Sequence, residues 1–106
     1  MSYEELLNKV RGFNLERDWG QFHTPANLAK SVCIEAGELL ECFQWRDDYD
    51  LEAVKDEIAD VFIYLLDMAD SVDVDLIEAA NRKLDKSAEK YPVEKARGSC
   101  LKYDKL

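Results

Sequence analysis

The segment from Leu51 to Val72 has the periodicity of a long α-helix and is apolar around most of its circumference. One apolar stripe is formed by Val54, Ile58, Val61, Leu65 and Val72. Further apolar residues on the opposite side are Ala59, Ile63, Leu66 and Ala69. Such a helix needs partners on every side, and a chain of 106 residues offers few. We therefore expect a helical bundle that is completed by oligomerisation, with the first helix and the C-terminal tail as the alternative cover.

Helix start signals divide the chain into four helices. We expect them over residues 2–19, 25–45, 51–72 and 74–90. Ser2 with Glu5 forms a capping-box pattern. The other N-cap candidates are Thr24, Asp50 and either Asp73 or Asp75. No segment alternates polar and apolar residues as a half-buried strand does. The sequence predicts an all-α protein with a single domain over residues 1–106, in which a helical body of about residues 2–90 precedes a tail of residues 91–106.

The composition argues against several classes of partner. The formal net charge of −9 and the pI of about 4.5 disfavour a nucleic-acid polymer or an anionic membrane as the main partner. The N-terminal MSYEELLNKV lacks the basic and apolar regions of a secretory signal, and the apolar run VFIYLL is too short to span a bilayer. The three cysteines form no CxxC pair and fit reduced thiols. We expect a cytoplasmic protein.

Two of the expected helices carry a glutamate inside their apolar stripe. Glu35 falls on the face defined by Leu28 and Leu39, and Glu57 is likewise placed among apolar neighbours. A carboxylate directed toward a core is costly unless something pairs with it. Each glutamate is followed three residues later by a second acid on the same face, which gives the pairs Glu35–Glu38 and Glu57–Asp60.

These acids point to a metal ion. If the second and third helices are antiparallel neighbours, the four carboxylates converge, and they cannot all stay ionised without a cation between them. Oxygen ligands alone favour hard divalent ions, Mg²⁺ first and Mn²⁺ second. A di-iron site would need Glu-x-x-His motifs, and the only histidine, His23, follows no such glutamate. The alternative is that both acidic pairs belong to solvated helix faces.

Aromatic and basic residues suggest a nucleotide as ligand. Trp45 lies seven residues after Glu38, about 10 Å along a helix, which is close to the span from a nucleobase to its phosphates. Other residues that could contact a base are Trp19, Phe22, His23 and Tyr64. A row on the fourth helix that could hold phosphates is formed by Lys83, Lys86 and Lys90, with Asn81 nearby. The alternatives are core positions for the aromatic residues, a hydrogen-bonded joint for His23 and a solvated face for the lysines.

Four blocks of the sequence resemble one enzyme family in their order and spacing. They are ERDWGQFHTPANLA, EAGELLECFQW, DEIADVFIYLLDMA and KYPVEKARGSCLKY. From about Phe13 to Tyr103 the chain is similar to the MazG-like all-α nucleoside triphosphate pyrophosphatases, and within them to the single-domain dCTP pyrophosphatase branch. The resemblance implies a MazG-like four-helix bundle, assembled as a tetramer that is a dimer of dimers. It also implies Mg²⁺ ligation by Glu35, Glu38, Glu57 and Asp60.

The resemblance further implies a reaction. A nucleoside triphosphate, with dCTP or a related dNTP preferred, would be hydrolysed between its α and β phosphates to the monophosphate and pyrophosphate, which removes unwanted nucleotides from the pool. Glu35 and Glu38 would be catalytic, and we expect Glu38 to be the general base because Mg²⁺ rarely needs every carboxylate. The residues implied in substrate binding are Trp19, Gln21, Phe22, His23, Trp45, Tyr64, Asn81, Lys83, Lys86, Lys90 and Tyr91. The rival hypothesis is a non-enzymatic acidic helical module that binds a basic protein partner.

Overall fold

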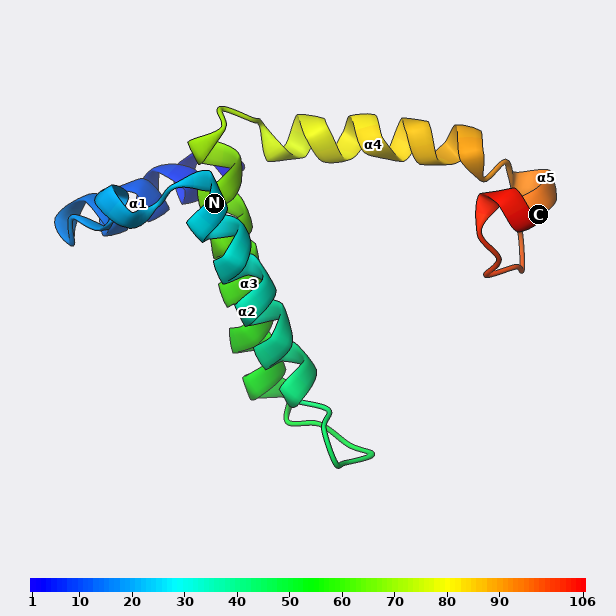
Figure 1. Ribbon diagram of the computed structural model, residues 1–106, viewed down its shortest axis with the longest axis horizontal. Coiled ribbons are helices and arrows are strands. Elements are labelled where there is room, and N and C mark those ends of the chain that lie inside the picture. The colour runs from blue at the N-terminus through cyan, green and yellow to red at the C-terminus, as the bar shows by residue number, and fades with distance from the viewer. The chain divides into compact units, whose positions relative to one another are not determined.

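The computed structural model describes residues 1–106 as an all-α protein, which confirms the predicted fold class (Figure 1). The elements in chain order are α1 (Tyr3–Glu16), the 3₁₀ turn η1 (Trp19–Phe22), α2 (Pro25–Glu41), α3 (Leu51–Ser71), α4 (Leu76–Lys90), α5 (Val93–Ala96) and the 3₁₀ turn η2 (Tyr103–Lys105). They form two compact units, Met1–Val74 and Asp75–Leu106. The single-domain organisation stays a prediction. None of the helices combines the length and the apolar character that crossing a membrane requires.

Capping residues explain where the long helices begin. At α1 the Ser2 hydroxyl accepts the Glu5 backbone N–H at 3.1 Å, and the Glu5 carboxylate accepts the Ser2 N–H at 3.3 Å, the reciprocal pair of a capping box. The other N-caps whose side chains accept a backbone N–H from the first turn are Thr24, Asp50 and Asp75. Asp73, the second candidate for the start of α4, instead lies in the left-handed region with φ of 56°.

Two helices end earlier than the periodicity predicts. Helix α1 ends at Glu16 rather than at residue 19, and α2 ends at Glu41 rather than at Trp45. After α2 the N–H groups of residues 42–44 bond to carbonyls three residues back, and Trp45 then takes a left-handed conformation with φ of 65°. After α1, Asp18 takes a similar conformation with φ of 53°. Neither stop is marked by a glycine, so apolar periodicity alone overestimates the length of both helices.

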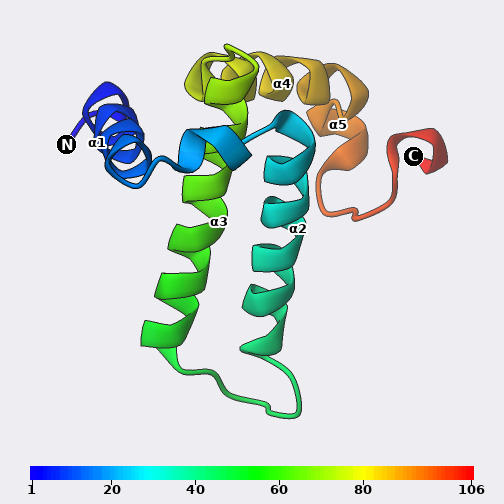
Figure 2. The ribbon, with the colours of Figure 1, turned by 60° about the vertical axis from the view of Figure 1, so that its left-hand side comes forward.

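Helices α2 and α3 form an antiparallel hairpin that frames the first unit (Figure 2). Each helix carries one fully buried side chain, Leu28 on α2 and Leu66 on α3, which are 1% and 0% exposed. The remaining buried apolar residues are Leu7, Val10, Val54 and Ala69. Helix α1 is fixed to α3 by Arg11, whose Nη2 and Nε donate to the two carboxylate oxygens of Asp70 at 2.6 and 3.1 Å. The hairpin therefore sets the positions of every acidic residue singled out above.

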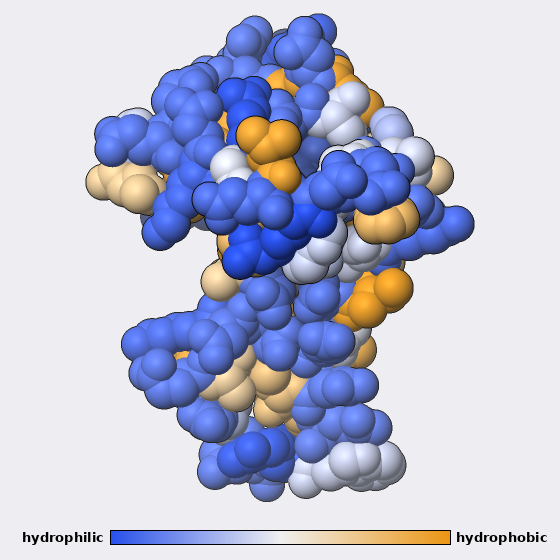
Figure 3. Space-filling model, turned by 90° about the vertical axis from the view of Figure 1, so that its left-hand side faces the viewer, coloured by the Kyte–Doolittle hydropathy of each residue, from blue (hydrophilic) through white to orange (hydrophobic).

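Several large apolar side chains of the hairpin lie exposed in the single chain. Ile34 and Leu40 on α2 are 62% and 72% exposed, and Ile58 on α3 is 52% exposed. Figure 3 shows apolar side chains among the hydrophilic ones on one face of the molecule. Exposed apolar surface of this kind is what association between copies would cover. Oligomerisation itself stays a prediction.

Candidate functional site

Four carboxylates converge between α2 and α3, as the antiparallel pairing predicts. Glu35 and Glu38 come from α2, and Glu57 and Asp60 come from α3. One oxygen of each residue can be chosen so that all four atoms lie within 4.8 Å of one another. Glu35 and Glu57 are half-buried, whereas Glu38 and Asp60 are exposed. We call these four residues the carboxylate cluster.

Two oxygens of the carboxylate cluster lack any hydrogen-bond partner. They are Oε2 of Glu35 and Oε2 of Glu57, and both atoms are buried. A buried carboxylate oxygen without a donor costs several kcal/mol, so native proteins rarely retain one without a function. Both orphaned atoms belong to the glutamates that interrupt apolar stripes in the sequence. The arrangement therefore calls for a positively charged ligand at this point.

Electrostatics within the carboxylate cluster lead to the same conclusion. Burial, followed by a hydrogen bond and the charge of Glu38, raises the pKa of Glu35 from 4.5 to about 7. Burial, followed by the charges of Glu38 and Asp60, also raises the pKa of Glu57. Four carboxylates at this separation retain a proton unless a cation offsets their charge. An oxygen-only donor set suits a hard divalent cation, so these residues could hold one.

A cleft adjoins the carboxylate cluster and contains three of the predicted base contacts. Its volume is about 210 Å³, and its lining residues are Phe13, Asn14, Trp19, His23, Asp60, Ile63, Tyr64 and Asp67. Trp19 meets Phe13 edge to face with ring centroids 5.5 Å apart. Burial, and then the charges of Glu35, Asp67 and Asp60, raise the pKa of the Tyr64 hydroxyl, which therefore keeps its proton. We call this space the aromatic cleft, and Asp60 belongs both to it and to the carboxylate cluster.

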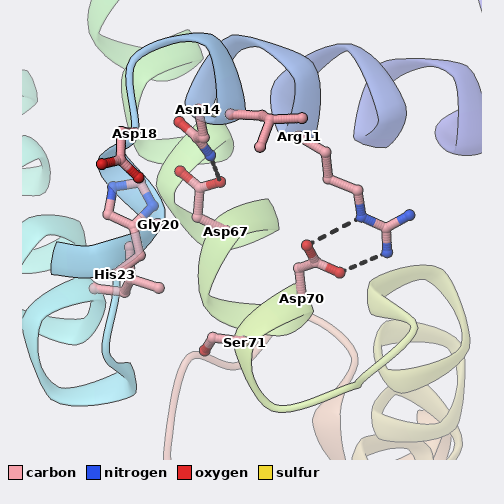
Figure 4. A pocket seen from close by; sticks show the side chains of 10 residues that line it. Arg11, Asn14, Asp18, Gly20, His23, Asp67, Asp70 and Ser71 are labelled. Carbon is pink, nitrogen blue, oxygen red and sulfur yellow. Dashed lines mark hydrogen bonds and ion pairs between the residues drawn. The ribbon is translucent and has the colours of Figure 1, made fainter.

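Asn14 and Asp67 line the aromatic cleft but were not singled out from the sequence. Asp67 is 8% exposed, and its Oδ1 accepts a hydrogen bond from Asn14 Nδ2 at 2.9 Å (Figure 4). Burial raises the pKa of Asp67, and the hydrogen bond from Asn14 lowers it. The two residues, with His23, also line a neighbouring cleft of about 270 Å³ that includes Arg11 and Asp70. Asp67 follows Tyr64 by three residues, so the sequence places both on the same face of the helix, and this spacing could have indicated that Asp67 lies near the site.

Other predicted contacts of the first unit lie outside the aromatic cleft. The Gln21 amide donates to the backbone carbonyl and carboxylate of Asp18, both at 3.0 Å. Phe22 is 59% exposed. Trp45 is 93% exposed and lies beyond the far end of α2 from Trp19, with about 25 Å of helix between these two ends. Trp45, which its spacing from Glu38 had placed near a base, therefore does not line the aromatic cleft of its own chain.

The remaining predicted contacts belong to the second unit. Exposed side chains on α4 include Asn81, Lys83, Lys86 and Lys90. Tyr91 ends the helix, and its hydroxyl accepts the backbone N–H of Tyr103 at 3.3 Å. Nζ of Lys90 lies 4.9 Å from the centroid of the Tyr103 ring, within the range of a cation–π contact. Within this unit Lys90 and Tyr91 thus stabilise the C-terminal segment.

Comparisons with known proteins identify relatives of the whole chain. Mouse (Mus musculus) dCTP pyrophosphatase 1 is 41% identical over 113 residues, which span 97% of this chain and 66% of the mouse protein. The bovine (Bos taurus) dCTP pyrophosphatase 1 is 40% identical over 119 residues, or 99% of this chain and 70% of the bovine protein. The chain thus spans about two thirds of the length of these relatives.

A solved structure agrees with the sequence matches. A pyrophosphatase from Archaeoglobus fulgidus superposes with a TM-score of 0.77 and 47% identity, covering 84% of this chain and 91% of the archaeal one. The family model that matches residues 30–106 is described as MazG-like. That match includes all four members of the carboxylate cluster. The chain belongs to the MazG-like family.

Proposed function

We propose that the protein is a Mg²⁺-dependent nucleoside triphosphate pyrophosphohydrolase that converts dCTP or a related dNTP to the monophosphate and pyrophosphate. The observation that carries the proposal is the buried, unpartnered oxygen on each of Glu35 and Glu57 inside a group of four carboxylates. An acidic face with a merely solvating role would leave these oxygens in water. The relatives named dCTP pyrophosphatase 1 and the archaeal pyrophosphatase support the same reaction class.

The donor chemistry of the carboxylate cluster fits Mg²⁺, with Mn²⁺ as a substitute. The residues that would hold the ion are Glu35, Glu38, Glu57 and Asp60. When bound, the cation supplies charge neutralisation for the triphosphate and activation of a water molecule. Because metal ligands are ionised carboxylates, binding should release the proton that Glu35 retains near neutral pH.

Glu38 is the exposed acid of the α2 pair and is assigned as the general base. Its carboxylate would take a proton from the attacking water as the water oxygen forms a bond to phosphorus. The phosphorus that the water attacks is that of the α phosphate. The bond from this phosphorus to the oxygen that bridges the α and β phosphates breaks, and pyrophosphate leaves with the electron pair of that bond. Glu35 lies one helical turn away on the same face of α2 and would act beside Glu38 as a ligand of the ion.

The aromatic cleft would receive the base. Trp19, His23 and Tyr64 supply a stacking surface and polar groups, and Asp60 connects the cleft to the carboxylate cluster. Its volume of about 210 Å³ is below the roughly 300–1,000 Å³ of complete small-molecule sites, so it suits one part of a nucleotide. Further substrate contacts that we propose are Gln21, Phe22, Trp45, Asn81, Lys83, Lys86, Lys90 and Tyr91.

The active assembly is proposed to be a homotetramer, arranged as a dimer of dimers. The exposed apolar side chains of α2 and α3, Ile34, Leu40 and Ile58 among them, support association between copies. Sedimentation velocity on the purified chain tests this part of the proposal directly. A monomer at micromolar concentration would contradict it.

The enzymatic proposal is tested by pyrophosphate release from a panel of dNTPs and NTPs. We expect release in Mg²⁺ and none in EDTA, with the highest rate for dCTP. Glu38→Gln should lower the rate roughly 100-fold or more, as expected for loss of a general base. The matched control is Glu41→Gln, which removes the same charge from an exposed position on α2 outside the carboxylate cluster. A folded protein that binds Mg²⁺ yet hydrolyses nothing would instead favour the non-enzymatic acidic module.

A further inference from the structure

One carboxylate oxygen of Asp67 accepts a hydrogen bond from the protein, and the other accepts none. Its Oδ1 accepts the Asn14 amide at 2.9 Å, whereas no protein group donates to Oδ2. The carboxylate is nevertheless almost completely buried, with 8% exposure, at the wall of the aromatic cleft. Figure 4 shows Asn14 and Asp67 facing one another from α1 and α3, with His23 on the segment between α1 and α2. An acceptor oxygen without a protein donor, beside stacking side chains, suits a ligand that donates a hydrogen bond.

The spacing of residues along helix α3 indicates where the hydrogen-bond donor of the ligand would lie. Asp60, Tyr64 and Asp67 follow one another at intervals of four and three residues, so they share one face of the helix. The rise from Asp60 to Asp67 is about 10 Å. That length is close to the span from the phosphates of a nucleotide to its base. If the carboxylate cluster takes the triphosphate, as the proposed function holds, Asp67 lies at the edge of the base.

The chemistry of this pair selects among bases. An ionised carboxylate only accepts hydrogen bonds, and Asn14 turns its amide nitrogen toward Asp67, which leaves the amide carbonyl as a second acceptor. Cytosine and adenine present an exocyclic amino group that donates, and uracil and thymine carry a carbonyl oxygen at the ring position where cytosine has its amino group. The small volume of the cleft favours one ring over two. Cytosine satisfies both conditions.

We infer that Asp67 is a specificity-determining residue that accepts a hydrogen bond from the exocyclic amino group of cytosine. Asn14 is the positioning residue, because its amide fixes the carboxylate. The inference rests on the proposed function and adds the group that distinguishes dCTP from dUTP. A purely structural role, in which Asp67 only ties α3 to α1, would leave that distinction unchanged.

The test compares substrates and variants in a matched set. The wild-type protein should hydrolyse dCTP with a kcat/KM on the order of ten- to hundredfold above that for the deoxynucleoside triphosphate of 2-pyrimidinone, which lacks only the amino group. Asp67→Asn should remove that advantage and raise the relative kcat/KM for dUTP, because an amide can donate to a carbonyl oxygen. Asp70→Asn is the control, since it breaks the Arg11 contact one turn further along α3 and outside the aromatic cleft.

The outcomes separate the inference from the proposed function. Equal hydrolysis of dCTP and the 2-pyrimidinone analogue by the wild-type protein overturns the inference without any variant, even if Asp67→Asn fails to fold. An active Asp67→Asn protein that keeps the preference for dCTP over dUTP also overturns the inference and leaves the proposed function standing. No pyrophosphate from any nucleotide overturns both.

Discussion

Raising the pH from about 5 to about 8 without divalent cations should destabilise the protein, because folding helps Glu35 to keep a proton. Burial, and then the hydrogen bond and charge of Glu38, raise the pKa of Glu35 from 4.5 to about 7. Between these values the folded state binds more protons than the unfolded state, so the free energy of unfolding falls as the pH rises. This stabilisation is complete below about pH 4.5 and is lost as the pH rises through about 7.

The size of the effect follows from the same values. One proton changes the free energy of unfolding by at most about 1.4 kcal/mol per pH unit. Over the interval from 4.5 to about 7 the upper limit for Glu35 is therefore about 3.4 kcal/mol. Water reaches part of this side chain and screens its charge, so we expect about 1–2 kcal/mol. For a domain of this size, that loss lowers the melting temperature by roughly 4–10 °C.

Urea unfolding followed by circular dichroism in EDTA measures this dependence. Glu35→Gln should flatten the decline between about pH 5 and 8, whereas Glu41→Gln, on the same helix but outside the carboxylate cluster, should retain it. Saturating Mg²⁺ should abolish or reverse the decline, because the bound ion favours ionised ligands. If the two variants follow the same pH dependence, general repulsion in an acidic protein is the cause, and the reasoning about Glu35 is refuted.

Three further predictions concern stability. Mg²⁺ at 100 times its Kd should stabilise the wild-type protein by about 2.7 kcal/mol, and the absence of a thermal shift in millimolar Mg²⁺ would contradict the metal site. Leu66→Ala should cost about 2–5 kcal/mol in urea unfolding because Leu66 is 0% exposed, whereas Leu15→Ala, at a position 81% exposed, should change stability by no more than about 0.5 kcal/mol. A double-mutant cycle on Arg11 and Asp70, whose side chains are 49% and 35% exposed, should give only a small coupling energy because solvent screens both charges. A coupling energy as large as the loss from Leu66→Ala would show that solvent does not screen this pair.

The features that could be predicted from the sequence are those set by residues close in the chain. The capping box of Ser2 and Glu5 and the caps at Thr24 and Asp50 involve neighbours within three residues, and the structure contains all of them. The convergence of the carboxylate cluster was also accessible, because two i,i+3 pairs on consecutive antiparallel helices must face each other if both interrupt an apolar stripe. The residue that indicated this cluster most clearly was Glu35, because it is a charged residue inside an apolar stripe.

The features that sequence reasoning missed depend on distant contacts or on unmarked turns. The hydrogen bond between Asn14 and Asp67 joins residues 53 positions apart, and neither an asparagine nor an aspartate in a sequence indicates a distant partner. The end of α2 depends on a left-handed Trp45, a conformation that glycine or asparagine would have signalled and tryptophan does not. As a result, Trp45 lies beyond the end of α2, off the helical spacing that was counted from Glu38, and its contact with a base stays a prediction.

The loop between α2 and α3 determines how this protein can change length during evolution. Doubling the length of the loop, residues 42–50, would cost only about 0.6 kcal/mol in closure entropy and would leave the pairing of the two helices intact. One residue inserted between Glu35 and Glu38 would instead rotate one carboxylate about 100° away from the other. Insertions and deletions among active homologues should therefore accumulate in this loop, while the spacing within each acidic pair stays constant.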